Sequence, residues 1–293
     1  MLGIDFDFPR YVAYRKGQVE QRARDGAAYS FSGERKVRRT LMSTRPVAIA
    51  IEATTRLWKS KARRDLLAAA DKASDRSHER LYRAARAAGA ALGVEPPAVV
   101  VPHGDVPVPS ATLGTDDDPI IVIARPLAER LDERELTALV GHELGHVQNN
   151  HVPYATALYY LRHEAFVFVR WIVQPAVMAL SGWSRRAEVT CDRAALIAVR
   201  DVDVALAAMV KAATGGEAPD DVRGHLAELA GSRGAASQVA DLFRSHPHLV
   251  KRARALEVFA ESALYRKLTG QGDGGLSGEE VDQRVGEIVK VFG

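Results

Sequence analysis

The segment at residues 132–150 constrains the fold of this chain more than any other part of the sequence. It begins with Asp132 and, three residues later, Glu135, which form a variant of the capping box that starts an α-helix. These acidic groups also suit the positive end of the helix dipole. The apolar run LTALV follows, and further apolar residues continue to Val147. We therefore predict a largely buried helix over this segment.

Three titratable residues, His142, Glu143 and His146, lie within this helix as the sequence HELGH. Residues four apart share one helix face, so both imidazoles can reach one ion. Glu143 lies beside the first histidine and off the line joining the two, which suits a general base acting on a metal-bound water. Buried titratable groups also need partners or a metal. The motif alone can occur by chance on a surface helix, so a zinc site also requires a third ligand.

Glu188 is the best candidate for the third ligand, because zinc in hydrolases usually has three protein ligands and one water. It lies in SRRAEVTCDRAAL, four residues before Asp192, which could accept the free N–H of a zinc-bound histidine. The alternative is that both carboxylates are surface charges paired with nearby arginines. Two other candidates are weaker. His151 falls one residue short of the third-histidine pattern, and Glu164 has no carboxylate four residues later.

The rest of the chain predicts a mainly α protein with a small β-sheet, an α+β class. Aromatic residues make up only 6 % of the sequence and alanine is abundant, which favours helices. Short β-branched runs at 96–104 and 119–124 predict strands, with a loop or hairpin between them. Helices are expected at 65–92, 154–180, 185–200, 203–213, 219–230, 234–244 and 248–266, with a last amphipathic helix after a glycine-rich break at 270–275.

The sequence divides into three expected parts: a basic segment at 1–65, a main domain at 66–268, and a glycine-rich linker with a C-terminal helix at 269–293. The first part contains the cationic cluster GERKVRRT, which we interpret as a solvated surface. A patch for anionic lipid, nucleic acid or an acidic partner is the alternative. No aromatic residue lies within the cluster and the net charge is only +3, so we expect no nucleic-acid partner.

We expect a cytoplasmic protein without a signal peptide, because acidic residues interrupt the first ten positions and no long apolar run follows. The single cysteine, Cys191, excludes an intrachain disulfide and is expected to be a buried inert thiol. The most apolar stretch, at 165–181, is interrupted by Arg170 and Pro175 and is short for a membrane span. It could form a hydrophobic wall, an oligomer contact or a shallow, peripheral membrane contact.

Three motifs in order, HELGH, SRRAEVTCDRAA and SHPHLVKR, resemble metallopeptidase family forty-eight, which includes HtpX-type proteases and CAAX prenyl endoproteases. The resemblance spans roughly Glu79 to Leu256 and implies a zincin-like domain with one Zn²⁺ per chain. The residue roles that it implies are zinc ligation by His142, His146 and Glu188, general-base catalysis by Glu143, support of a ligand histidine by Asp192, and stabilisation of the tetrahedral intermediate by His246.

These motifs together predict a zinc endopeptidase that hydrolyses a peptide or protein substrate through a metal-activated water. The strand at 119–124 could pair with an extended substrate at the sheet edge. Membrane members of the family have transmembrane helices between the two zinc segments. Here residues 147–187, 41 in all, are too few for two crossings of roughly 20 apolar residues each plus a turn. The alternatives are a catalytically silent, zinc-stabilised chaperone-like protein and a membrane-peripheral binding protein. An intact Glu143 argues against a silent site.

Overall fold

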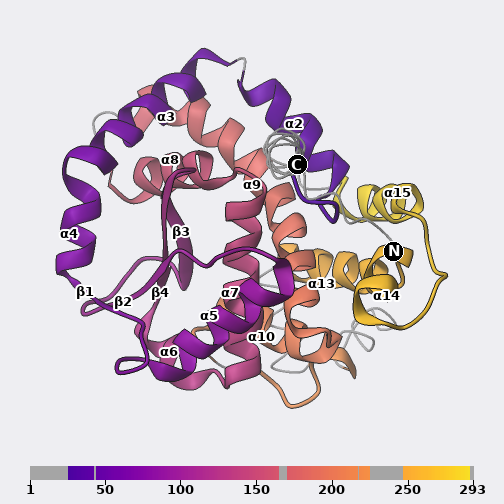
Figure 1. The fold of residues 1–293 in the computed structure, drawn as a ribbon. Coiled ribbons are helices and arrows are strands. Elements are labelled where there is room, and N and C mark those ends of the chain that lie inside the picture. Colours follow the sequence, from indigo (N-terminus) through magenta and orange to yellow (C-terminus); the bar gives the residue numbers. More distant parts are fainter. Residues whose placement is uncertain (1–25, 43, 165–169, 217, 225–246, 291–293) are drawn as a thin grey trace, which may run out of the picture.

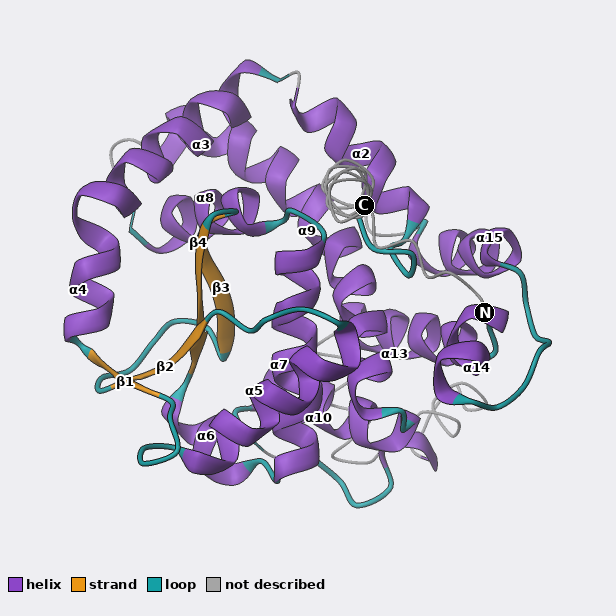
Figure 2. Cartoon of the chain, in the orientation of Figure 1, coloured by secondary structure: helices purple, strands orange, loops and turns teal. Residues whose placement is uncertain are grey.

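The computed structural model describes residues 26–42, 44–164, 170–216, 218–224 and 247–290 of the chain (Figure 1). Most of these residues are helical, and four short strands form one mixed sheet (Figure 2). The predicted class, mainly α with a small β-sheet, is therefore confirmed. Within the described ranges, no helix combines the length and the apolar character that crossing a lipid bilayer requires.

The sheet has the strand order β1-β2-β4-β3. Its strands are Ala70–Lys72 (β1), Ala98–Pro102 (β2), Ser110–Thr115 (β3) and Asp118–Ile123 (β4). β2 and β4 are parallel, whereas β1 and β3 run antiparallel to their neighbours. The predicted strands at 96–104 and 119–124 are confirmed as β2 and β4. The segment between them contains β3, which forms an antiparallel hairpin with β4.

Both faces of the sheet are buried, and the alternation of side chains along each strand assigns them to two cores. Val101 and Ile121 belong to a core that the sheet shares with two helices, described next. Val100 and Val122 point to the other face and pack in a core with Trp58. Strands buried on both faces explain why the sequence of β2 and β4 is continuously apolar.

Helix α7 spans Glu133–Gln148 and begins as predicted. The Asp132 carboxylate accepts the backbone N–H of Glu135 at 2.8 Å, and the Glu135 carboxylate accepts the backbone N–H of Asp132 at 3.0 Å. Helix α5 (Glu79–Leu92) packs beside α7 and ends at Gly93, whose φ of +65° is the left-handed conformation that glycine favours. The sheet therefore lies against a two-helix layer.

The prediction of one helix over residues 65–92 is wrong. Helix α4 (Arg63–Ala68) ends before β1, whose backbone pairs with β2. A turn follows, in which the Ser74 hydroxyl accepts the backbone N–H of Ser77 at 3.1 Å, and α5 begins only after this turn. Serine side chains that bond nearby backbone groups compete with the helix, which explains the interruption.

Helix α9 (Arg170–Val199) has 30 residues and packs along α7. The sequence predicts two helices there, at 154–180 and 185–200. That prediction is wrong, because α9 continues through 181–184 and buries Trp183 in a core. The first part of the expected helix at 154–180 is instead a separate helix, α8 (Val152–His163).

The N-terminal part contains α2 (Ser32–Met42), α3 (Arg45–Leu57) and the π-helix η1 (Trp58–Ala62). Figure 1 shows α2, α3 and α4 as an arc around the sheet and α8. Val47 of α3 is buried in the core that also holds Trp183. Hence the weakly patterned beginning of the chain covers one side of the molecule.

The C-terminal part consists of further helices packed around α9. These are α10 (Val202–Thr214), α13 (Pro247–Ala260), α14 (Ala263–Thr269) and α15 (Gly278–Val289), while the short α6 (Arg125–Arg130) follows β4. The expected helix at 248–266 is two helices, because Ser262 caps α14 by accepting the N–H of Tyr265. Most of the expected helices at 219–230 and 234–244 lies outside the described residues.

Candidate metal centre and active site

Helices α7 and α9 bring the three predicted ligands together. Nε2 of His142 lies 3.4 Å from Oε2 of Glu188, and Nε2 of His146 lies 3.8 Å from Oε1 of the same carboxylate. In a tetrahedral zinc site, with bonds near 2.0–2.1 Å, ligand atoms are separated by about 3.3 Å. The two nitrogens and the carboxylate are therefore spaced for one small divalent cation.

Cys191 is a second potential ligand next to the histidines. His142, His146 and Cys191 each offer a ligand atom, and these atoms lie within 4.8 Å of one another. The thiol is buried, as expected, and burial raises its pKa well above the usual value. Glu188, whose two carboxylate oxygens face the two Nε2 atoms, is the other candidate for the third ligand.

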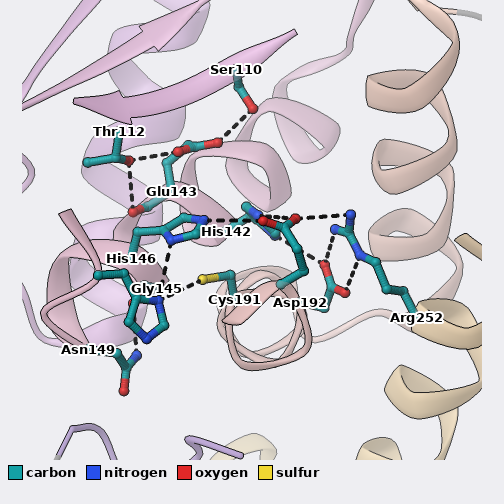
Figure 3. Close-up of polar contacts among 12 residues, drawn as sticks. Ser110, Thr112, His142, Glu143, Gly145, His146, Asn149, Cys191, Asp192 and Arg252 are labelled. Carbon is teal, nitrogen blue, oxygen red and sulfur yellow. Dashed lines mark hydrogen bonds and ion pairs between the residues drawn. The ribbon is translucent and has the colours of Figure 1, made fainter. Parts of the chain in front are cut away.

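The Glu143 carboxylate is buried and held by two hydroxyl groups of β3 (Figure 3). Ser110 donates to its Oε1 at 2.6 Å, and Thr112 donates to its Oε2 at 2.7 Å. Burial raises the pKa of Glu143, although His142 and the two hydroxyl groups oppose this effect. A carboxylate with a raised pKa beside a metal site can both accept and return a proton.

Ser110 and Thr112 were not identified from the sequence. Their i, i+2 spacing places both side chains on one face of a strand, which is the only signal for them. The segment was expected to be a loop or hairpin, so that signal could not be read.

Asp192 supports His142 from the side opposite Glu188, as expected for a ligand-supporting carboxylate. Its Oδ1 lies 3.1 Å from Nδ1 of His142. Arg252 of α13 donates to both Asp192 oxygens, at 2.8 and 2.6 Å, and its third nitrogen lies 3.0 Å from Glu188 (Figure 3). The guanidinium and the two histidines lower the pKa of Glu188 despite its burial. Both carboxylates are therefore ionised at neutral pH.

The two histidines differ in protonation. Burial favours the neutral form of His142, but Asp192 and Glu188 outweigh this and raise its pKa to about 10. Burial dominates at His146 and lowers its pKa to about 3. A bound cation would therefore replace a proton on His142, while His146 is already neutral.

The other sequence candidates lie elsewhere. His151 is buried behind His146 rather than at the ligand position, with 3.3 Å between their Nδ1 atoms. Glu164 is exposed and follows the last residue of α8. His246 lies outside the described residues.

A cavity of about 280 Å³ opens beside the candidate metal position. It is lined by β3 with the residues just before it and by residues of α7, α8, α9, α10 and α13. β3 is the edge strand at this side, whereas β4 is paired on both sides by β2 and β3. The prediction that the strand at 119–124 offers its edge to a substrate is therefore wrong, because β3 already pairs with the edge of β4 that β2 leaves open.

The chain is similar to one protein family and to individual proteins of known name. The model of Peptidase family M48 matches residues 71–260. The Plastoglobule-localized metallopeptidase 48 of Arabidopsis thaliana is 31 % identical over 191 residues, which are 60 % of this chain and 56 % of that protein. The match thus covers less than two thirds of this relative.

Two bacterial or archaeal relatives are also similar. Protease HtpX homolog 2 of Methanosarcina mazei is 27 % identical over 55 % of this chain and 66 % of its own length. Protease HtpX of Hydrogenovibrio crunogenus is 25 % identical over 59 % of this chain and 67 % of its own length. No solved structure matches the chain.

Proposed function

The chain belongs to peptidase family M48, and from this premise we propose that it is a zinc endopeptidase that hydrolyses peptide bonds with Glu143 as general base. The observation that carries the proposal is the convergence of two imidazoles and a carboxylate beside a separately held Glu143. His142, His146 and Glu188 would hold the zinc. A purely structural site would not need a buried carboxylate next to its ligands.

Bound zinc would lower the pKa of a water molecule and polarise the substrate carbonyl. Glu143 would take a proton from the attacking water as the water oxygen bonds to the carbonyl carbon, and would deliver that proton to the amine nitrogen as the C–N bond breaks. Ser110 and Thr112 keep the carboxylate pointing at the reaction, because each donates to a different oxygen. We assign His246 the role of donating a hydrogen bond to the developing oxyanion.

The cavity beside the site suits an extended peptide substrate. The first residues of β3 line it, so their free backbone edge could pair with the substrate. Farther along β3, both backbone groups of Gly114 bond to the Thr156 hydroxyl, at 2.8 and 3.2 Å. The available edge is therefore short and lies next to Glu143.

The test compares wild type, Glu143→Gln and Glu164→Gln by metal analysis and cleavage of a peptide library. We expect about one zinc per chain in all three proteins. Glu143→Gln should lose cleavage by roughly 10²–10⁴-fold, the usual contribution of general acid–base catalysis. Glu164→Gln is the matched control, because this carboxylate is exposed and contacts no predicted ligand. Cleavage by Glu143→Gln at the wild-type rate would show that the base is another residue.

The same assay separates the peptidase from the silent, zinc-stabilised alternative. A wild-type protein that binds zinc but cleaves no library peptide would favour the chaperone-like role. A cytoplasmic location, with a peripheral membrane contact through residues 165–181, remains a prediction. Co-sedimentation with anionic and neutral vesicles tests that contact.

A further inference from the structure

A buried series of side-chain contacts leads from His146, through His151, to Glu34, away from the candidate metal position. Nδ1 of His146 lies 3.3 Å from Nδ1 of His151. Nε2 of His151 lies 3.3 Å from Oε1 of Glu34, within ion-pair distance. The side chains of His151 and Glu34 are both fully buried, at 0 % exposure. Glu34 belongs to α2 and precedes His146 by more than a hundred residues in the sequence.

The protons along this series of contacts can have only one arrangement if His146 binds a metal through Nε2. Its proton is then on Nδ1 and is donated to Nδ1 of His151. His151 must therefore carry its own proton on Nε2, which faces the Glu34 carboxylate. The Glu34 carboxylate, as the last acceptor in the series, thus selects the tautomers of both His151 and His146.

Glu34 is held in place as an ionised acceptor. Nε1 of Trp183 donates to its Oε1 at 2.8 Å, and Nε of Arg38 lies 3.5 Å from the same oxygen. Burial alone would raise the pKa of Glu34, but His151, Trp183 and Arg38 lower it below the usual value. A buried carboxylate is costly unless it is paired, and these three contacts pair it.

Cys191 is a second neighbour of the same nitrogen. Its Sγ lies 3.8 Å from Nδ1 of His151. That nitrogen has one lone pair, and an imidazole N–H is a stronger donor than a thiol. His146 is also the closer of the two groups, so Nδ1 of His151 accepts its hydrogen bond from His146 and not from Cys191.

We propose that Glu34 and His151 are positioning residues that fix the tautomer and ring orientation of His146, and that α2 is therefore a working part of the metal centre. The two ligand histidines then have separate supports: Asp192 for His142, and Glu34 through His151 for His146. α2 lies outside residues 71–260, which match the family model, so its contribution belongs to this chain's own N-terminal part. The inference rests on the metal centre of the proposed function.

The test measures zinc affinity by chelator competition and the absorption spectrum of the cobalt-loaded protein. Glu34→Leu, which removes the acceptor, and His151→Leu should bind zinc about 10–100-fold more weakly, the usual effect of losing such a support. His151→Gln should stay within about threefold of wild type, because an amide can accept from His146 and donate to Glu34. Glu52→Leu is the matched control, since Glu52 is an exposed carboxylate on the neighbouring α3 and should change nothing.

Melting curves in excess chelator show whether each variant folds. Wild-type zinc affinity and cobalt spectrum in a folded Glu34→Leu would overturn the inference. If Glu34→Leu does not fold, the two His151 variants decide: equal affinities in folded His151→Gln and His151→Leu would also overturn it. None of these readouts needs turnover. A protein without peptidase activity can therefore still support the inference, and an active one can still contradict it.

Discussion

At the scale of single residues, Glu143, the proposed general base, is carried by α7 but its carboxylate is held by a strand. Ser110 and Thr112 are 33 and 31 residues from Glu143 in the sequence, yet both donate to its carboxylate. Thr112 also donates to the backbone oxygen of Glu143 at 3.2 Å. Because these bonds favour the ionised form, they keep the carboxylate able to accept a proton although it is buried.

Thr112→Val should therefore impair catalysis without removing the metal. Valine keeps the shape but leaves one carboxylate oxygen without its donor. A hydrogen bond to a charged group is worth about 1.5–3 kcal/mol, so kcat/KM should fall by roughly 10–100-fold if the bond is equally important in the transition state. Thr115→Val, in the same strand but outside the cavity, should stay near wild type. Equal rates for the two variants would refute the role of Thr112.

At the scale of elements, the site depends on how closely α7 approaches α9. The contact is made at Gly141 and Gly145. A Cβ at Gly145 would lie 2.9 Å from Cα of Cys191 and 3.0 Å from Cβ of Ala194. Both neighbours belong to α9, which also carries Glu188. The glycine of HELGH therefore sets the distance between the histidines and the third ligand.

Gly145→Ala should separate the two helices and weaken zinc binding. Alanine favours a helix by about 1 kcal/mol over glycine, but overpacking costs typically 1–3 kcal/mol. We expect a net loss in the free energy of unfolding, measured with urea in chelator, and a larger zinc dissociation constant. Gly182→Ala is the control on α9, because a Cβ there meets nothing within 4 Å. That variant should be as stable as wild type or more so, with unchanged zinc affinity.

At the scale of the whole molecule, the site is built from parts distant in sequence. α7 and α9 supply the proposed ligands, β3 holds the proposed base, α13 provides Arg252, and α2 provides Glu34. The two ends of the described chain also meet. Asp282 of α15 accepts the backbone N–H of Ser32 at 2.9 Å and pairs with Arg193 at 2.8 Å.

Removing the metal should lower the melting temperature of the entire chain. Zinc would join two helices that form the centre of the molecule, and a ligand at 100 times its dissociation constant stabilises the folded state by about 2.7 kcal/mol. For a domain of 150–250 residues each kcal/mol corresponds to about 2–4 °C, so we expect a decrease of at least about 5 °C. Differential scanning calorimetry with and without chelator measures it. An identical melting temperature in both conditions would argue against a metal bound by α7 and α9.

Local patterns were enough to predict α7, its capping box, β2, β4 and the residues that the structure brings together as candidate ligands. Each depends on neighbours within a few positions, such as the i, i+4 spacing of His142 and His146. Glu34 and Ser110 could not be found this way, because their partners are distant in the sequence. Glu34 contacts His151, more than a hundred residues away, and Ser110 contacts Glu143, 33 residues away. Strand order likewise comes from tertiary pairing, which is why β4 was wrongly expected at an edge.

The position of these supports along the chain has a consequence for protein synthesis. A nascent chain that ends before Arg252 already contains both histidines and Glu188, but it lacks the guanidinium that pairs with Glu188 and Asp192. It also lacks Asp282, which fastens the start of α2. A nascent chain released before residue 252 therefore lacks the guanidinium beside Glu188, and one released between residues 252 and 281 still lacks the carboxylate that fastens α2.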